Sequence, residues 1–166
     1  MILRPASTSD HPAILALWNP IIRTTTLTFS SEEKTAESLG EMIRARRAAG
    51  QEFWVAELDG GLDGGLAGFA TYGQFRGGNG YAHAFEHTIH LAGAARGRGL
   101  GRALMTTLQD HARAAGGHTL FAGISGENPA AVAFHAALGF ATVATLPETG
   151  RKFGRWLDLV LMMKFL

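Results

Sequence analysis

The sequence predicts an α/β (α+β) fold, in which about four helices cover the faces of one mixed sheet of about seven strands. Short apolar runs alternate with segments of helical periodicity along the whole chain. Hydrophobic residues make up 46% of the 166 residues and charged residues only 17%, which favours a packed globule. No repeat, low-complexity tract or linker divides the chain. We therefore expect a single domain over residues 1–166.

Apolar spacing, capping residues and glycines locate the expected elements. Strands are expected over 2–5, 53–58, 66–72, 118–124, 140–146 and 153–165, with a disputed stretch at 81–92. Helices are expected over 9–22, 30–49 and 129–138, and another follows a glycine-rich loop and ends at Gly116-Gly117. The turn DGGLDGG at 59–65 should close a hairpin, and 73–80 should form a loop. The order of these elements gives a sheet with helices on its faces.

Charge and cysteine content exclude several classes of function. The net charge of +1 gives no general attraction to nucleic acid. The chain has no cysteine, so disulfides, thiolate zinc sites and cysteine nucleophiles are absent. The N-terminus lacks the apolar core of a signal peptide, and no apolar run approaches the ~18 residues of a membrane span. We expect a cytoplasmic protein that binds neither nucleic acid nor membrane.

The stretch YAHAFEHTIH at 81–90 allows two interpretations. His83-x-x-Glu86-His87 has the spacing of an inverted zinc-protease motif, which requires a helix. In a strand, Glu86 and His90 would point to one side, and His83 and His87 to the other. The composition allows either, but the stretch lies between a glycine loop and an anion-binding loop, which favours a strand. A zinc hydrolase remains the alternative, and we expect no metal.

The glycine-rich segment at 96–101, RGRGLG, stands at the start of a helix and is the strongest chemical signal. Glycines let backbone N–H groups crowd around an anion, and a helix start adds unpaired donors. Arg96, Arg98 and Arg102 add positive charge. A phosphate or pyrophosphate is the natural ligand, although a solvated basic turn would look the same. The segment lacks the Gly-Lys-Ser/Thr ending of a P-loop and the Rossmann glycine spacing.

The spacing Arg96-x-x-Gly99-x-Gly101 resembles the Gln/Arg-x-x-Gly-x-Gly/Ala signature of the Gcn5-related N-acetyltransferases, whose order of elements also matches. This resemblance implies a mostly antiparallel sheet and acetyl-CoA as acetyl donor. The stretches GQFR, FEHTIHL, ENPAAVAFHAALGF and KFGRWLDLVLM are similar to the phosphinothricin and methionine sulfoximine acetyltransferase branch. That branch implies a homodimer and α-amino acceptors such as L-methionine sulfoximine, L-methionine sulfone or phosphinothricin.

The resemblance also implies which residues hold acetyl-CoA. The pantetheine arm would pair with the strand before the glycine loop, where a backbone N–H would polarise the thioester carbonyl. The loop amides would take the pyrophosphate. The implied cofactor-binding residues are Ile89, His90, Leu91, Gly97, Arg98, Gly99, Leu100, Gly101, Arg102 and Asn128. Asn128 serves equally well as a helix N-cap. Relatives commonly differ at Arg96, His90 and Gly93-Ala94, which bears on rate and substrate range.

Two residues are implied as catalytic. Glu86 would take a proton from the substrate ammonium, directly or through water, so that the free amine can attack. It would otherwise form a salt bridge or a hydrogen bond to substrate. His135 occupies a position where many relatives carry a tyrosine that protonates the departing thiolate, and histidine can do so near neutral pH. It would otherwise pack against the cofactor.

The remaining implied residues bind the amino-acid substrate. Arg76 would hold a carboxylate through two parallel hydrogen bonds, unless it is an exposed loop arginine. The implied substrate-binding residues are Arg76, Gly77, Gly78, Glu86, His87 and Thr88, with Phe29 as a wall. Two alternatives to this function remain. One is an acetyltransferase for another amine, such as a protein N-terminus or a polyamine, and the other is a non-catalytic acyl-CoA sensor.

Overall fold

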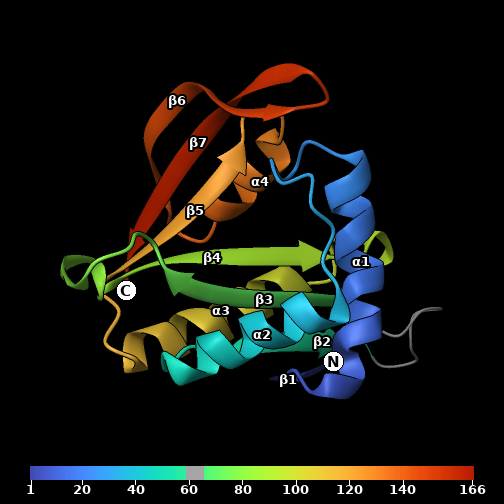
Figure 1. Cartoon of the computed structure of the whole chain (residues 1–166). Helices are drawn as coiled ribbons and strands as arrows, with labels where there is room; N and C mark the ends of the chain where they lie inside the picture. Colours follow the sequence, from blue (N-terminus) through green and yellow to red (C-terminus); the bar gives the residue numbers. More distant parts are fainter. Residues whose placement is uncertain (59–65) are drawn as a thin grey trace.

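The computed structural model describes residues 1–58 and 66–166. Within them, seven strands form one sheet in the order β1-β2-β3-β4-β5-β7-β6, accompanied by four α-helices (Figure 1). The strands are β1 Ile2–Pro5, β2 Phe53–Glu57, β3 Gly68–Gln74, β4 Ala84–Leu91, β5 Thr119–Ser125, β6 Ala141–Lys152 and β7 Arg155–Phe165. The helices are α1 His11–Thr24, α2 Ala36–Ala48, α3 Leu100–Ala114 and α4 Pro129–Ala136. The fold class predicted from the sequence is confirmed. No helix in these two ranges is both long and apolar enough to span a membrane.

The second helix begins later than the sequence predicts. It starts at Ala36 rather than at residue 30, because Thr35 is its N-cap. The Thr35 hydroxyl accepts a hydrogen bond from the Ser38 amide at 3.1 Å, and the Ser38 hydroxyl accepts one from the Thr35 amide at 3.0 Å. Before this cap, the side-chain amide of Asn19 in α1 makes two hydrogen bonds to the backbone of Lys34, each 2.9 Å long. This long-range anchor keeps the preceding residues out of the helix.

Two other boundaries differ from those expected from the sequence. β3 extends through residue 73 to Gln74, where the sequence predicted a loop, because β3 stays paired with β4 as far as Gln74 and Phe85. The last helix ends at Ala136, two residues earlier than predicted, and is followed by Gly139 with φ of +87°. The DGGLDGG turn at 59–65 lies outside the described residues. β2 and β3, which it was expected to join, are antiparallel neighbours.

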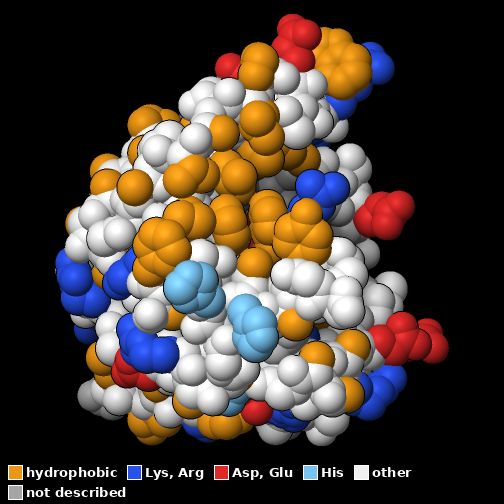
Figure 2. All heavy atoms as spheres, turned by 90° about the vertical axis from the view of Figure 1, so that its left-hand side faces the viewer, with side chains coloured by type: hydrophobic (Ala, Val, Ile, Leu, Met, Phe, Trp, Pro, Cys, Tyr) orange, Lys and Arg blue, Asp and Glu red, His pale blue; other side chains and the backbone are white. Residues whose placement is uncertain are grey.

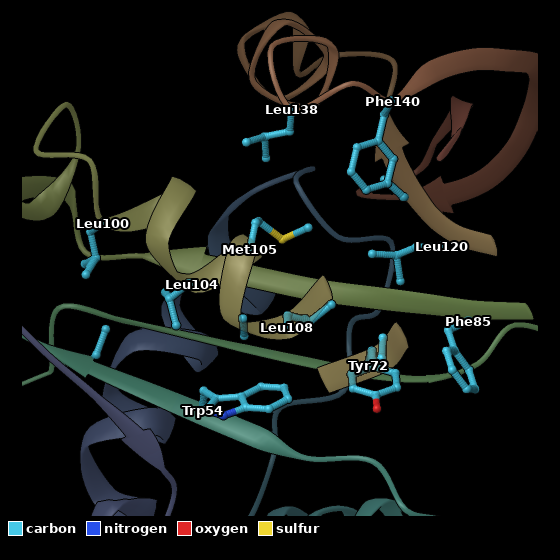
Figure 3. Close-up of a cluster of buried hydrophobic side chains, with 14 of the residues drawn as sticks. Trp54, Tyr72, Phe85, Leu100, Leu104, Met105, Leu108, Leu120, Leu138 and Phe140 are labelled. Atoms are coloured by element: carbon cyan, nitrogen blue, oxygen red, sulfur yellow. The ribbon is translucent and has the colours of Figure 1, made fainter. Parts of the chain in front are cut away.

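Side-chain alternation along the strands divides the core into two clusters on opposite faces of the sheet. In β3, Phe69 belongs to the cluster beneath α1 and α2, whereas Tyr72 belongs to the cluster beneath α3. Figure 3 shows the second cluster, in which Leu104 and Leu108 of α3 face the sheet. Both leucines are fully buried. This packing fixes α3, and with it the position of the glycine loop that precedes it.

The sheet opens between its two middle strands. β4 and β5 pair only where Ala84–Glu86 of β4 lies beside Thr119–Phe121 of β5. Beyond these residues β4 continues along β3 and β5 continues along β7, so the two strands diverge (Figure 1). Among the residues that the structure describes, one backbone edge of β4 therefore has no strand partner after Glu86. The gap opens toward the segment that leads into α3.

Candidate active site

The glycine loop has the geometry of an anion site. Gly97 and Gly99 have φ of +73° and +79°, a backbone conformation that glycine adopts without steric cost. Gly99 is the N-cap of α3, and its carbonyl accepts the first helical hydrogen bond, from Ala103 at 3.1 Å. The amides of Leu100, Gly101 and Arg102 therefore lack acceptors inside the helix. These amides lie at the positive end of the helix dipole, where an anion is stabilised.

The side chains of this loop have two separate roles. Leu100 is fully buried and anchors the start of α3 in the core. A Cβ on Gly101 would lie 3.1 Å from the Phe134 ring and 3.2 Å from Leu91, so this glycine allows α3 to approach α4 and β4 closely. Arg96, Arg98 and Arg102 are exposed. The unpaired amides of the loop and the exposed arginines next to them both favour the binding of an anion.

The end of β4 leads from the sheet to this loop. Ile89, His90 and Leu91 pair with β3 on one edge, and their other edge faces the gap between β4 and β5. The His90 ring packs 5.4 Å from Phe69 and 5.9 Å from Trp18. Burial, and secondarily Arg96, lowers the pKa of His90 to about 4, so this ring is uncharged at neutral pH. The backbone of this stretch is free to add an extended ligand, as a further strand would be added.

Asn128 acts as the N-cap of α4. Its side-chain oxygen accepts a hydrogen bond from the Ala131 amide at 3.1 Å. Asn128 therefore has the helix-capping role that the sequence allowed. The Nδ2 group makes no hydrogen bond to the residues that the structure describes, so it is available to a ligand.

Glu86 is the last residue of β4 that pairs with β5, at the point where the sheet begins to open. The neighbouring strands carry glycine next to it, namely Gly73 in β3 and Gly123 in β5. A Cβ on Gly123 would lie 2.8 Å from Glu86 Oε1, so the carboxylate extends toward β5 through space that a side chain would fill. Burial raises the pKa of Glu86, and the positive charge of Arg46 partly opposes this. A half-buried carboxylate with a raised pKa is suited to accept a proton.

Arg46 is a neighbour of Glu86 that the sequence did not identify. It lies in the last turn of α2, where a basic residue is explained by the helix dipole alone. In the structure, its guanidinium lies over Gly73, and a Cβ there would overlap it. The signal that could have found this contact is the glycine itself, because a glycine inside a strand often marks close approach by another group.

An apolar floor adjoins Glu86 on the same face of the sheet. Phe121 of β5 pairs with Glu86 in register, and its ring stacks on Phe75 with centroids 4.1 Å apart. The register of β5 with β7 extends this surface through the half-buried Leu161 and Met163. Figure 2 shows hydrophobic side chains gathered across the middle of the face that points left in Figure 1. The aliphatic part of an amino-acid side chain fits such a surface.

The loop after β3 is folded around one glutamine. Gln74 Nε2 donates hydrogen bonds to the carbonyls of Arg76, at 2.5 Å, and Gly78, at 2.7 Å. Gly78 has φ of +101°, and a Cβ on Gly77 would meet no atom within 4 Å. Arg76 is exposed, and its guanidinium lies 5.6 Å from the centre of the Tyr81 ring. This loop borders the apolar floor through Phe75.

Phe29 and Thr88 complete the residues expected near substrate. Thr88 lies two residues beyond Glu86 in β4, on the same face, and is half-buried. Phe29 lies against Gly150 of β6, where a Cβ would overlap the ring. The preceding carbonyl, Thr28, accepts a hydrogen bond from Lys152 Nζ at 2.8 Å. Phe29 thus belongs to a segment that joins the helical side of the molecule to the β6–β7 hairpin.

His87 and His135 meet on the opposite face of the sheet. His87 Nε2 lies 2.9 Å from His135 Nε2, and both rings are buried. His87 Nδ1 donates to the Phe121 carbonyl at 2.8 Å, and His135 Nδ1 donates to the Ala131 carbonyl at 2.7 Å. The His87 side chain therefore does not share a surface with Glu86, and the structure separates these two expected substrate contacts. Both nitrogens of His135 are also occupied.

The number of ring protons limits the hydrogen bonds that His87 and His135 can make. Each Nδ1 faces a carbonyl oxygen, which only accepts, and the two Nε2 atoms face each other. Three hydrogen bonds would need three ring protons, but an uncharged pair carries only two. Burial lowers the pKa of His87 to about 3, reinforced by His135 and opposed by the Phe121 carbonyl, and burial also lowers the pKa of His135. The pair is therefore uncharged at neutral pH, with one of the three contacts lacking a proton.

We expect this pair to make the protein less stable as the pH falls. The unfolded histidine binds protons below its reference pKa of 6.5, whereas folded His87 does so only near pH 3. The contribution of the pair to the free energy of unfolding is therefore fully present above pH 6.5. It is lost as the pH falls from 6.5 toward 3, by at most about 1.4 kcal/mol per pH unit for each histidine. Urea unfolding at pH 7 and pH 5 measures the loss. His87→Gln should reduce it, and an unchanged pH dependence in that variant would contradict the assignment. The raised pKa of Glu86 makes the protein more stable as the pH falls, so the variant distinguishes the effect of His87 from that of Glu86.

Residues 83–87 do not have the helical geometry that an inverted zinc-protease motif requires. Residues 84–91 form strand β4 rather than a helix, as the sequence context favoured. His83 Nδ1 bonds the Gly116 carbonyl at 2.7 Å, His87 turns toward α4, and Glu86 lies on the other face. Across residues 1–58 and 66–166, no group of three or more His, Cys, Asp or Glu side chains is arranged to hold a metal ion.

Comparison with known proteins gives a consistent result. Residues 18–140 match the model of the Acetyltransferase (GNAT) family. The L-methionine sulfoximine/L-methionine sulfone acetyltransferase of Salmonella typhimurium is 34% identical over 98% of this chain and 92% of its own length. The phosphinothricin N-acetyltransferase of Streptomyces coelicolor is 33% identical over 95% of this chain and 91% of its own length.

Two solved structures share the whole fold. The structure of yncA from Salmonella typhimurium with its cofactor acetyl-CoA superposes with a TM-score of 0.92 and 34% identity, covering 100% of this chain and 94% of that one. The ribosomal-protein-alanine N-acetyltransferase of Brucella melitensis superposes with a TM-score of 0.92 and 37% identity, covering 100% of both chains. The match of the family model, the shared fold and the identity to these relatives establish that the chain belongs to the acetyltransferase (GNAT) family.

Proposed function

We propose that this protein is an acetyl-CoA-dependent N-acetyltransferase that acts on the α-amino group of a small amino-acid-like substrate. L-Methionine sulfoximine, L-methionine sulfone and phosphinothricin are the proposed acceptors, and the amine attacks directly in a ternary complex. The observation that carries the proposal is the position of Glu86. This half-buried carboxylate stands where β4 and β5 diverge, between a free backbone edge and an apolar floor. The names of the relatives and the branch resemblance support the choice of acceptors.

The residues around the gap fit acetyl-CoA, which when bound would supply the acetyl group. Gly97 and Gly99 would meet no atom within 4 Å if they carried a Cβ, so the loop surface is open to a phosphate. The amides of 100–102 would bind the pyrophosphate, and the free edge of 89–91 would align the pantetheine arm. A backbone N–H of that edge would stabilise the negative charge that develops on the carbonyl oxygen. Asn128 Nδ2 is the remaining side-chain donor assigned to the cofactor.

Proton transfer is assigned to two residues on opposite sides of the sheet. Glu86 takes a proton from the substrate ammonium, directly or through water, which frees the lone pair for attack. His135 would donate a proton to the departing thiolate; because its Nδ1 proton is donated to the Ala131 carbonyl and the pair is uncharged, its Nε2 first has to take up a proton from water. Its Nε2 faces His87 in this structure, so His87 has to release that atom before His135 can donate there. Arg76, the glycines after it and Thr88 border the acceptor, and His87 contributes only its backbone to that side.

The most direct test measures thiol release with different amines. We expect turnover with L-methionine sulfone, L-methionine sulfoximine or phosphinothricin, and none with N-acetylated methionine sulfone, whose amine is blocked. Spermidine and a peptide with N-terminal alanine form the competing arms, the second because one structural relative is a ribosomal-protein-alanine N-acetyltransferase. Turnover only in a competing arm would replace the proposed acceptor. CoA binding without turnover of any amine would instead indicate an acyl-CoA sensor.

We also propose that the protein is one domain that acts in the cytoplasm as a homodimer. The single sheet that joins all seven strands supports one domain. Large apolar side chains exposed on the β6–β7 hairpin support association. They are Val143, Leu146, Phe153 and Trp156. Sedimentation at several protein concentrations measures the oligomeric state, and a monomer at all of them would contradict a dimer.

A further inference from the structure

Arg46 is held over a position in the sheet that carries no side chain. A Cβ on Gly73 would lie 2.6 Å from Arg46 Cζ and 3.2 Å from Nη2, so any other residue there would displace the guanidinium. Gly73 pairs in register with Glu86, and alternation places the two residues on the same face of the sheet. The chain thus brings a cation from the end of α2 to the strand position beside the candidate base.

The guanidinium donates no hydrogen bond to the residues that the structure describes. Arg46 is half-buried, yet it makes no hydrogen bond or ion pair within 1–58 and 66–166. The next residue behaves differently, because Arg47 bonds Glu52 at 2.8 Å and the Ala6 carbonyl at 2.7 Å. A guanidinium offers five donors, and leaving them unpaired in a half-buried position is unfavourable. Such an arrangement is typical of a cationic side chain that binds an anionic ligand.

The spacing between Arg46 and Glu86 suits an amino acid. Each group shifts the pKa of the other through its charge. No ion pair joins them, so the nitrogen atoms of Arg46 are more than 4.0 Å from the carboxylate oxygens of Glu86. An α-amino acid carries its ammonium and its carboxylate on the same carbon. A ligand placed between these residues can therefore direct its ammonium to Glu86 and its carboxylate to Arg46. Each charge of the ligand then meets an opposite charge.

We propose that Arg46 binds the α-carboxylate of the acceptor amino acid, and that Gly73 is required because it leaves room for this guanidinium. This inference rests on the proposed function and specifies how the acceptor is held. It also gives Arg76 a separate task. Arg76 lies on the exposed loop against Tyr81 and borders the apolar floor through Phe75, so it is placed to meet the polar end of the acceptor side chain.

The test compares L-methionine sulfone with its α-carboxamide, which keeps the amine and loses the negative charge. The wild type should prefer the acid. In Arg46→Gln we expect the KM for the acid to rise about 10- to 100-fold, because a charge-assisted bidentate pair is lost, while the KM for the carboxamide changes little. Arg46→Lys should restore part of the preference. The KM for acetyl-CoA should stay constant in both variants.

Two further variants keep the result interpretable. Arg44→Gln removes an exposed arginine from the same helix and should leave both KM values unchanged. Gly73→Ala should reproduce Arg46→Gln, because the added methyl group displaces the guanidinium. Thermal unfolding of each variant verifies that it is folded. If Arg46→Gln raises the KM for acid and carboxamide equally, Arg46 does not recognise the carboxylate and the inference is wrong.

This outcome is distinct from failure of the proposed function. If the wild type acetylates neither compound, the proposed function fails, and calorimetric binding of L-methionine sulfone to wild type and Arg46→Gln then decides the inference. Weaker binding to the variant supports a carboxylate site at Arg46. Equal binding, or no binding to either protein, overturns it.

Discussion

Replacing Glu86 by glutamine should lower kcat for the acceptor amino acid by about 10²- to 10⁴-fold, the usual contribution of a positioned general base. Glutamine keeps the shape of the side chain but has no basic oxygen. The KM for acetyl-CoA should not change, because the glycine loop and the free edge of β4 remain intact. Initial rates with saturating acetyl-CoA measure the effect.

The pH dependence identifies the role of Glu86 more sharply than the rate alone. Burial raises its pKa, so the wild-type rate should climb as the pH passes through that raised value and Glu86 loses its proton. This limb of the profile should disappear in Glu86→Gln. Glu37→Gln removes the same charge at an exposed position of α2 and serves as the control. If Glu86→Gln keeps full activity across the pH range, Glu86 is not the base.

Replacing Gly99 by valine should raise the KM for acetyl-CoA by at least about tenfold. Gly99 has φ of +79°, where a residue with a side chain pays about 1–2 kcal/mol, and more if it is β-branched. The loop has to change its backbone to relieve this strain, which turns the amides of α3 away from the phosphate. Calorimetric titration with CoA measures the loss directly.

A matched glycine replacement controls for this experiment. Gly93 lies in the same connection, has no positive φ, and would meet no atom within 4 Å if it carried a Cβ. Gly93→Ala should therefore bind CoA as the wild type does. Equal CoA affinity in a folded Gly99→Val protein would show that this loop does not hold the cofactor.

Local patterns were sufficient to predict the order of the strands and helices, although β6 runs to Lys152, beyond the predicted end at 146. The glycine loop combines residue types that act through their own backbone, so its anion-binding geometry depends on few distant contacts. The alternation in 84–91 correctly separated Glu86 from His87 once a strand was assumed. The same alternation shows why His87 and Glu86 do not share one substrate surface through their side chains. The start of α2 was missed because the bond between Asn19 and Lys34 spans 15 residues.

The sequence by itself determined the fold class, the glycine loop before α3 and the position of a carboxylate at the centre of the sheet, because periodicity and glycine placement are local properties. Tertiary structure alone decided which groups surround that carboxylate. Arg46 reaches Glu86 only because α2 packs across β3 at a glycine, and His135 reaches His87 only because α4 covers the gap where β4 and β5 separate. Contacts of this kind join residues 40 to 48 positions apart, and no local pattern encodes them.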